Sequence, residues 1–493
     1  MKTKAKNMNA PKWLQNNIAL FSAVTVLIFG WLLTCGSMIA QSGDATDIWK
    51  TITTIHSASP YPSYVLYKGF SSLFPYVWLY DLAAVMGIDD FFFIRLYHAM
   101  LFSYVATIGI PAVTEHFLHY KPRLWQKLLL SALLFYFWSW TRALTQIMVD
   151  LPSCASFIAA MHLACKFDET IGDNRLVFVG VCGLMCALCG SISGQYMPAV
   201  MCIGIFVLIR VFRPNVKHPV VNLPRHKKFL TLACFILGCA VVVGVRIVFK
   251  ITIYERITAD SSILEGGFWL RRGLLYMMDK QRMFMEPATL NDARGYALLQ
   301  SLYGQNADSI LDAASQGAVS FGIVEYFAAV IKHPIDFLVR YIDRFFLCLS
   351  PDRGRLSASS LFLGYLFVYL TLYTIVTRCQ QVRDIFCAEF WLAMAAPASV
   401  IATLALTVEM RYAMGLQSMI YGVALAGPAL PEIYDKLCSF FTTLHKKGGC
   451  ALLAQRRFAW GLIIGIIFIA VCFAHIGAIY AQTPLGEAML FTW

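Results

Sequence analysis

Charged side chains are scarce in this sequence. Asp, Glu, Lys and Arg make up 14% of its 493 residues, and hydrophobic residues make up 59%. Soluble domains carry roughly 25% charged residues, because their surfaces face water. A water-soluble fold cannot bury so large an apolar fraction. The composition therefore excludes an ordinary soluble protein and predicts an all-α polytopic membrane protein.

Two short motifs are missing as well. No Asn-x-Ser/Thr glycosylation acceptor occurs, so nothing indicates a glycosylated endomembrane protein, and a bacterial inner membrane is the simpler expectation. No GxxxxGK[ST] loop occurs either, which disfavours nucleotide hydrolysis as the source of energy. Most of the 15 cysteines lie inside apolar runs. We therefore interpret the Cys186-x-x-Cys189 motif as membrane packing, not as a redox pair.

What the sequence does have is a series of apolar runs that recur along the chain. Runs of about 20 residues can cross a hydrocarbon core about 30 Å thick. We predict about eleven membrane-spanning helices in a single domain over 1–493, at 17–40, 90–118, 129–141, 151–165, 176–192, 195–212, 229–249, 358–377, 385–405, 411–431 and 459–479.

The net charge of +12 has a topological explanation. The segments predicted to face the cytoplasm hold 22 of the 40 Lys and Arg residues but six of the 28 acids. Such an excess of basic residues is typical of short cytoplasmic loops. We therefore expect a cytoplasmic N-terminus, contact with membrane lipids and no nucleic-acid partner. The segments are 1–16, 119–128, 166–175, 210–228, 378–384 and 432–457.

Two longer segments are predicted on the opposite, periplasmic side. The first outer loop, 42–89, contains pieces that read as interfacial helices. The large outer loop, 250–357, ends in an amphipathic stretch at 334–348, where Pro334 suits a helix start. We expect that helix to lie along the membrane interface.

Carboxylates and arginines gather on this predicted outer side. A carboxylate can accept the proton of an attacking hydroxyl, and the planar fork of arginine can hold a phosphate. Together they suit transfer of a group from a lipid phosphate to a hydroxyl. The candidate catalytic residues are Asp44, Asp47 and Asp150, and the candidate phosphate-binding residues are Arg142, Arg271, Arg272 and Arg411.

Each candidate also has a purely structural explanation. Asp44 could cap a helix starting at Ala45, and Asp150 could be a helix N-cap. Arg411 could extend toward the interface or pair with Glu409. The remaining arginines could anchor their segments at anionic headgroups. The set Glu115, His116 and His119 has metal-like spacing, but it falls at the cytoplasmic end of a predicted helix.

Several short motifs resemble the GT-C family of integral-membrane glycosyltransferases. They are GDATD after the first helix, FFFIRLYHAML entering the second, DLP at Asp150, HPIDF at His333 and EMRY at Glu409. In order and topology the resemblance spans roughly residues 17–431, but each motif is short and degenerate. The chain departs from many members by lacking a soluble C-terminal domain, which would leave acceptor recognition to the loops.

The resemblance implies an all-α GT-C-like bundle that uses a polyprenyl-phosphate-sugar donor. An acidic residue of the first outer loop would be the catalytic acid/base, which here is Asp44, with Asp150 as a second carboxylate. The chain lacks a clear second metal-type acidic pair, so no metal ligand is assigned and use of a divalent metal stays open.

The function expected from these features is hexosyl transfer to a lipid-linked envelope glycan of O-antigen or lipopolysaccharide type, with undecaprenyl phosphate as the lipid carrier. Two alternatives stay open. A polysaccharide polymerase or ligase needs similar groups but a lipid-diphosphate donor. A flippase or transporter would be favoured by charges inside the helices facing a central cavity.

Overall fold

The structure is a computed structural model that describes residues 12–38, 44–56, 70–170, 173–213, 225–254, 327, 330–349, 358–378, 384–405, 410–435, 438–439 and 456–481. Every regular element in these ranges is a helix. The predicted all-α membrane fold is therefore confirmed for the part of the chain that is described.

Between residues 70 and 213, short connections join successive helices. Residues 92–118 form one continuous rod in which a π-helical turn (η1, Val105–Gly109) joins α5 (Phe92–Tyr104) to α6 (Ile110–Leu118). The remaining elements are α1 (Lys12–Thr34), α2 (Asp44–Thr54), α4 (Phe70–Met86), α7 (Leu124–Tyr136), α8 (Trp138–Thr145), α9 (Asp150–Glu169), α10 (Asn174–Ile192), η2 (Gly194–Tyr196), α11 (Met197–Phe212), α12 (Arg225–Tyr254), α17 (Pro334–Cys348), α18 (Ala358–Arg378), α19 (Ala388–Ala398), α20 (Ile401–Ala405), η6 (Met410–Ala413), α21 (Met414–Ala426) and α24 (Arg456–Ala481).

Six helical segments among the described residues are long and apolar enough to cross a membrane, or seven if α8 and α9 count as one bent span. The predicted number of eleven stays a prediction. Predicted ranges differ from the structure mainly at breaks between helices. The helix expected over 129–141 is split at Phe137, between α7 and α8. The connection expected over 141–150 is partly helical, because α8 forms there and meets α9 at an angle of 111°. The helix expected over 385–405 is interrupted just after Pro397, between α19 and α20.

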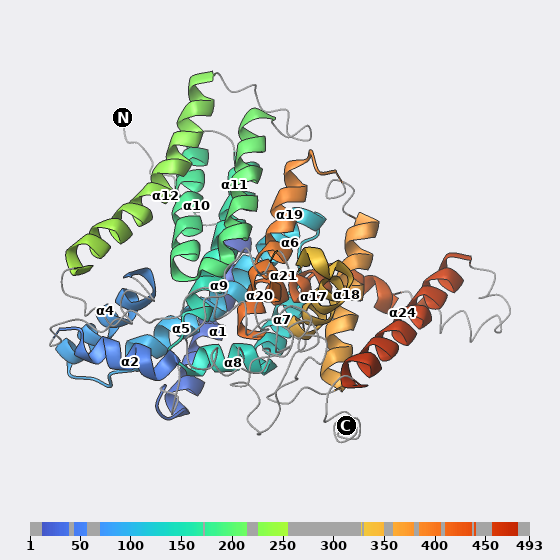
Figure 1. Ribbon diagram of the computed structural model, residues 1–493, viewed down its shortest axis with the longest axis horizontal. Coiled ribbons are helices and arrows are strands. Elements are labelled where there is room, and N and C mark those ends of the chain that lie inside the picture. The colour runs from blue at the N-terminus through green and yellow to red at the C-terminus, as the bar shows by residue number, and fades with distance from the viewer. Residues whose placement is uncertain are drawn as a thin grey trace, which may run out of the picture.

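The two ends of helix α9 define the two ends of the bundle. Its 20 residues cover about 30 Å at 1.5 Å per residue. We call its two ends the Asp150 end and the Glu169 end. It packs against α10, which in turn packs against α12, and α10, α11 and α12 stand together as one group (Figure 1). Helices α2, α5 and α8 gather at one end of the bundle, at the bottom of Figure 1.

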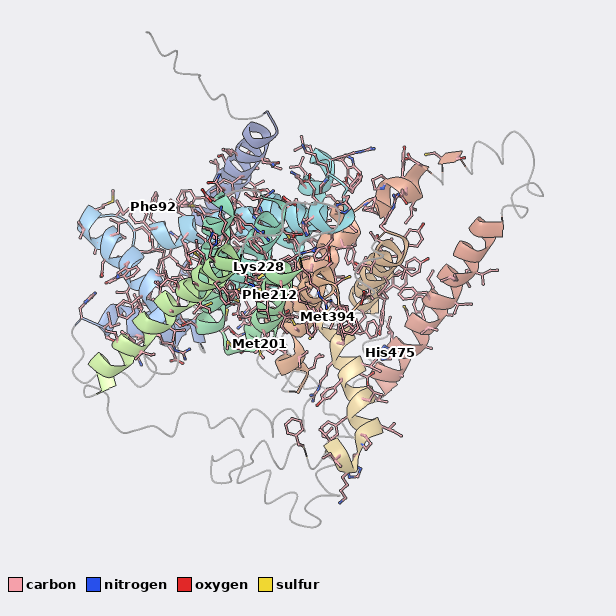
Figure 2. All side chains as sticks on the ribbon, turned by 90° about the horizontal axis from the view of Figure 1, so that it is seen from above. Phe92, Met201, Phe212, Lys228, Met394 and His475 are labelled. Atoms are coloured by element: carbon pink, nitrogen blue, oxygen red, sulfur yellow. The ribbon has the colours of Figure 1, made fainter. Side chains whose placement is uncertain are left out.

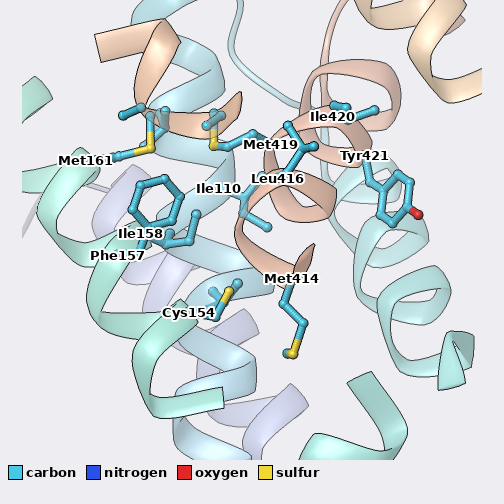
Figure 3. Close-up of a cluster of buried hydrophobic side chains, with 14 of the residues drawn as sticks. Ile110, Cys154, Phe157, Ile158, Met161, Met414, Leu416, Met419, Ile420 and Tyr421 are labelled. Carbon is cyan, nitrogen blue, oxygen red and sulfur yellow. The ribbon is translucent and has the colours of Figure 1, made fainter. Parts of the chain in front are cut away.

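Helix α21 is the centre of the bundle, since all 13 of its residues are buried. Its apolar side chains pack with those of α9 and α6, and Figure 3 shows Met419 and Leu416 of α21 in the same buried cluster as Met161 of α9 and Ile110 of α6. Two glycines seven positions apart, on one face, permit this close approach. A Cβ atom at Gly415 would lie 2.8 Å from the ring of Tyr196, and one at Gly422 would lie 2.1 Å from a methyl group of Ile110.

The cysteines of α10 pack as the sequence predicts. Cys182, Cys186 and Cys189 are buried and free. The Cys182 thiol donates to the Ala160 carbonyl and the Cys189 thiol to the Ser153 carbonyl, each over 3.4 Å. Both carbonyls belong to α9, so these thiols fill the α9–α10 interface.

Helix α17 buries two charged side chains near its end and exposes two apolar ones. Ile335 and Leu338 are exposed, whereas Asp343 and Arg344 are buried. The Asp343 carboxylate lies 2.5 Å from Nε2 of His475 on α24, and the Arg344 guanidinium donates to the Leu404 carbonyl over 2.7 Å. Helix α24 approaches the bundle near His475 and diverges from it toward its other end (Figure 2).

Candidate functional site

At the Asp150 end, two segments that are far apart in the sequence meet. One is the exit of α1, and the other is the four-residue connection between α8 and α9. The Ile147 amide donates to the Met38 carbonyl over 3.0 Å, and both side chains are buried in a small core beneath α2 and α4. Met38, just after the end of α1, therefore lies beside the residues that lead into Asp150.

Arg95 of α5 fixes the exit of α1. Its side chain is buried, and one NH2 group donates to the carbonyls of Gly36, at 3.0 Å, and Cys35, at 3.4 Å. Its other terminal nitrogen lies 2.8 Å from the carboxylate of Asp89. An arginine inside an apolar helix needs such partners, because an unpaired buried charge is costly.

Asp89 holds Arg95 from the turn between α4 and α5. Partial burial favours the neutral acid, but the Phe91 amide and the Arg95 guanidinium outweigh it and lower the pKa of Asp89. Asp89 therefore stays ionised at neutral pH and can orient Arg95.

One turn further along α5, His98 holds the connection between α8 and α9. Its Nδ1 atom donates to the Leu144 carbonyl over 2.9 Å, and its Nε2 atom lies 2.9 Å from the hydroxyl of Tyr76. That hydroxyl donates to the Met148 carbonyl over 2.6 Å. Burial, followed by Tyr97 and then the charge of Asp150, raises the pKa of Tyr76, so the phenol keeps the proton that it donates.

Asp150 and Arg411 form a buried ion pair at this end. The Arg411 NH1 atom lies 3.5 Å from Oδ2 of Asp150, and the side chains are 7% and 2% exposed. Asp150 is the first residue of α9, and Arg411 sits in the 3-10 turn η6 just before α21. The turn that leads into α21 thus places Arg411 beside the first residue of α9.

The surroundings of Arg411 are polarisable and aromatic. One guanidinium nitrogen lies 3.6 Å from the Met148 sulfur, and another donates to the Tyr412 hydroxyl over 3.1 Å. The guanidinium also lies 4.9 Å from the centre of the Tyr412 ring. Gln195 in turn donates to the Tyr412 carbonyl over 3.3 Å. These contacts fix the arginine while its ion pair with Asp150 supplies the opposite charge.

Two structural explanations from the sequence are wrong. Val149 occupies the N-cap position of α9, so Asp150 is not the cap of that helix. Arg411 is 6% exposed, so it does not extend toward the interface. Glu409, its other predicted partner, lies outside the described residues.

The remaining candidates lie elsewhere or outside the described part. Asp44 is the first residue of α2, and its side chain is not among the described ones. Asp47 is exposed, on the side of α2 away from the buried Ile48 and Ile52. Arg142 of α8 donates to the Gln146 side chain over 2.9 Å. Arg271 and Arg272 lie outside the described residues.

Sequence reasoning gave no role to Arg95, His98 or Tyr76. A signal for the first two was available, since an arginine and a histidine three positions apart share one face of a helix, and polar residues inside apolar spans require partners. Tyr76 gave no such signal, because nothing in its own segment distinguishes it from neighbouring aromatic residues.

A second charged cluster lies at the Glu169 end. Arg210 of α11 contacts two carboxylates, that of Asp168 at 3.0 Å and that of Glu389. His116 lies 3.1 Å from the Glu169 carboxylate and 3.8 Å from that of Asp168. Among the described residues, no group of three or more His, Cys, Asp or Glu side chains could hold a metal ion.

Comparison with known proteins gives little further information. No family model matches the chain, and no curated protein matches it at a significant level. Among solved structures, it is similar to the archaeal oligosaccharyltransferase AglB from Archaeoglobus fulgidus, in complex with an inhibitory peptide and a dolichol-phosphate. The sequence identity is 13% and the TM-score is 0.42 over 98% of this chain. The match covers 60% of the AglB chain, so this chain spans less than two thirds of that protein.

Proposed function

We propose that this protein is a GT-C-type glycosyltransferase of a bacterial inner membrane. It moves a hexose from a polyprenyl-phosphate donor, with undecaprenyl phosphate as the carrier, to a lipid-linked envelope glycan of the O-antigen type on the periplasmic face. The observation that carries the proposal is the buried ion pair of Asp150 and Arg411, at the end of the bundle where the exit of α1 meets the start of α9.

The candidate residues have the chemistry that such a transfer needs. The acceptor hydroxyl attacks the anomeric carbon of the donor sugar and gives its proton to Asp44, while Asp47 or Asp150 orients it. The bond between the anomeric carbon and the phosphate oxygen breaks, and the polyprenyl phosphate leaves. Arg411 stabilises the negative charge that grows on this phosphate, because a fixed guanidinium matches its oxygens.

The other predicted arginines are assigned to the same phosphate from neighbouring segments. Arg142 approaches from α8, which contacts the turn η6 that carries Arg411. Arg271 and Arg272 would contribute from the large outer loop. These assignments rest on residue type and predicted side of the membrane.

The transport alternative has a specific observation against it. Charges lining a route for substrate should face a water-filled cavity. The cluster around Arg210 is instead buried and ion-paired, since this arginine contacts Asp168 and Glu389 and its side chain is 6% exposed. Such an arrangement suits a fixed contact between helices.

Purified protein in nanodiscs should transfer sugar from a polyprenyl-phosphate donor without ATP or an ion gradient. Asp44→Asn should lower the transfer rate by about 10²–10⁴, while Asp90→Asn, an exposed acid in the turn between α4 and α5, serves as the matched control. A protein that moves lipid-linked glycan across liposomes without forming a glycosidic bond would contradict the enzyme assignment. Near-normal transfer by Asp44→Asn would leave Asp47 or Asp150 as the base.

A further inference from the structure

The Asp150–Arg411 pair is neutral as a unit. Both side chains are almost completely buried, and their charges face each other across 3.5 Å. The nearby side chains of Tyr76, Cys154 and Tyr196 lie close enough to sense the charge of Asp150. A second anion brought to Arg411 would therefore meet the carboxylate that already lies beside it.

We propose that Asp150 is the resident counter-ion of Arg411 and that the donor's lipid phosphate displaces it when the donor binds. This inference rests on the proposed function, because it takes Arg411 as the phosphate ligand. A carboxylate and a phosphate offer similar oxygen acceptors to a guanidinium fork, so the two anions compete for the same donors. Without donor, the pair keeps the arginine desolvated and oriented.

The exchange has a consequence for the reaction. While Asp150 is held by Arg411, its carboxylate is stabilised by an adjacent positive charge and is a weaker proton acceptor. Once the phosphate takes over Arg411, Asp150 is released next to the donor sugar. The carboxylate is then available to orient the acceptor hydroxyl. Donor binding thus precedes the activation of the acceptor.

The direction in which Asp150→Asn changes the affinity for the lipid phosphate distinguishes this role from a purely structural one. If Asp150 competes with the phosphate, Asp150→Asn removes the competing carboxylate beside Arg411, so the affinity for the lipid phosphate rises. If Asp150 only positions Arg411, the same change loosens the arginine and the affinity falls. Asp150→Glu restores a carboxylate and should return the affinity toward the wild-type value.

The measurement is binding of a short polyprenyl monophosphate to the full-length protein in nanodiscs of neutral lipid, with the unphosphorylated polyprenol as control. We expect Asp150→Asn to bind the phosphate at least about tenfold more tightly, a typical size for coupling between sites. Polyprenol binding should not change. In an Arg411→Gln background, Asp150→Asn should have no effect on phosphate binding.

A second measurement uses the wild-type protein, in case Asp150→Asn does not fold. Carbodiimide labelling of Asp150, followed by mass spectrometry, should increase when polyprenyl phosphate is added and not when polyprenol is added. Unchanged or reduced labelling, or equal or weaker phosphate binding by Asp150→Asn, overturns the exchange. A wild-type protein with no preference for the phosphate over polyprenol overturns the proposed donor class as well.

Discussion

The charged cluster at the Glu169 end makes a prediction that does not depend on the function. Arg210→Met keeps a long side chain in place but removes the charge that faces two buried carboxylates. The side chains of Asp168 and Glu389 are 5% and 11% exposed. Helices α9, α11 and α19 each contribute one member of this group, so the change affects three helices at once.

The expected loss follows from the burial. Breaking a buried ion pair by removing one partner costs about 3–5 kcal/mol, because it leaves an uncompensated charge. Two carboxylates share this arginine, but the cost does not double, since one acid can take up a proton when two like charges lie close together. A loss of about 4 kcal/mol lowers the ratio of folded to unfolded protein by about a thousandfold at roughly 1.4 kcal/mol per tenfold.

Thermal unfolding of the purified variants in one detergent measures this effect. Arg213→Met is the matched control, because Arg213 follows α11 directly and is exposed. The triple variant Arg210→Met, Asp168→Asn, Glu389→Gln removes all three charges and should recover most of the lost stability. An Arg210→Met protein as stable as Arg213→Met would refute the role given to the cluster, as would a triple variant less stable than Arg210→Met alone.

Two further predictions concern the Asp150 end and the core. Tyr76→Phe keeps the ring but removes the hydroxyl group that donates to the buried Met148 carbonyl. Leaving that carbonyl unsatisfied costs about 1–3 kcal/mol of stability. The substitution should lower the rate of transfer more than donor binding, and unequal effects on kcat and KM would show this. Gly422→Leu forces side-chain atoms into Ile110 and should lower the melting temperature, while Gly204→Leu, with nothing within 4 Å of an added Cβ, should not.

The helices could be predicted from the sequence because the membrane leaves few alternatives. A chain that crosses lipid must satisfy its backbone internally, so an apolar run of sufficient length becomes a helix. The run predicted at 90–118 corresponds to the continuous rod at 92–118, and the run at 176–192 corresponds to α10. The breaks were not predictable in this way, since hydropathy does not distinguish a straight span from the bent pair α8–α9.

The residues of the candidate site could be proposed from their types, but the contacts between them could not be predicted. Asp150 and Arg411 were candidates because each lies at the end of an apolar run. Their pairing depends on α21 inserting through the centre of the bundle, which Gly415 and Gly422 permit. Such a long-range arrangement leaves no local pattern. The hydrogen bonds of Tyr76 to two other segments are long-range as well, so its contacts could be found only from the structure.

The charged clusters at the two ends of α9 differ in a way that favours ligand binding at the Asp150 end. Arg210 bridges two carboxylates from two other helices, so an incoming ion would have to break several contacts. Arg411 faces Asp150 across 3.5 Å, a separation longer than a direct hydrogen bond. In the exchange proposed above, the phosphate would make shorter, charge-assisted bonds to the same guanidinium. We therefore propose that an anionic ligand replaces a protein group at the Asp150 end, whereas the buried contacts of Arg210 hold three helices together at the Glu169 end.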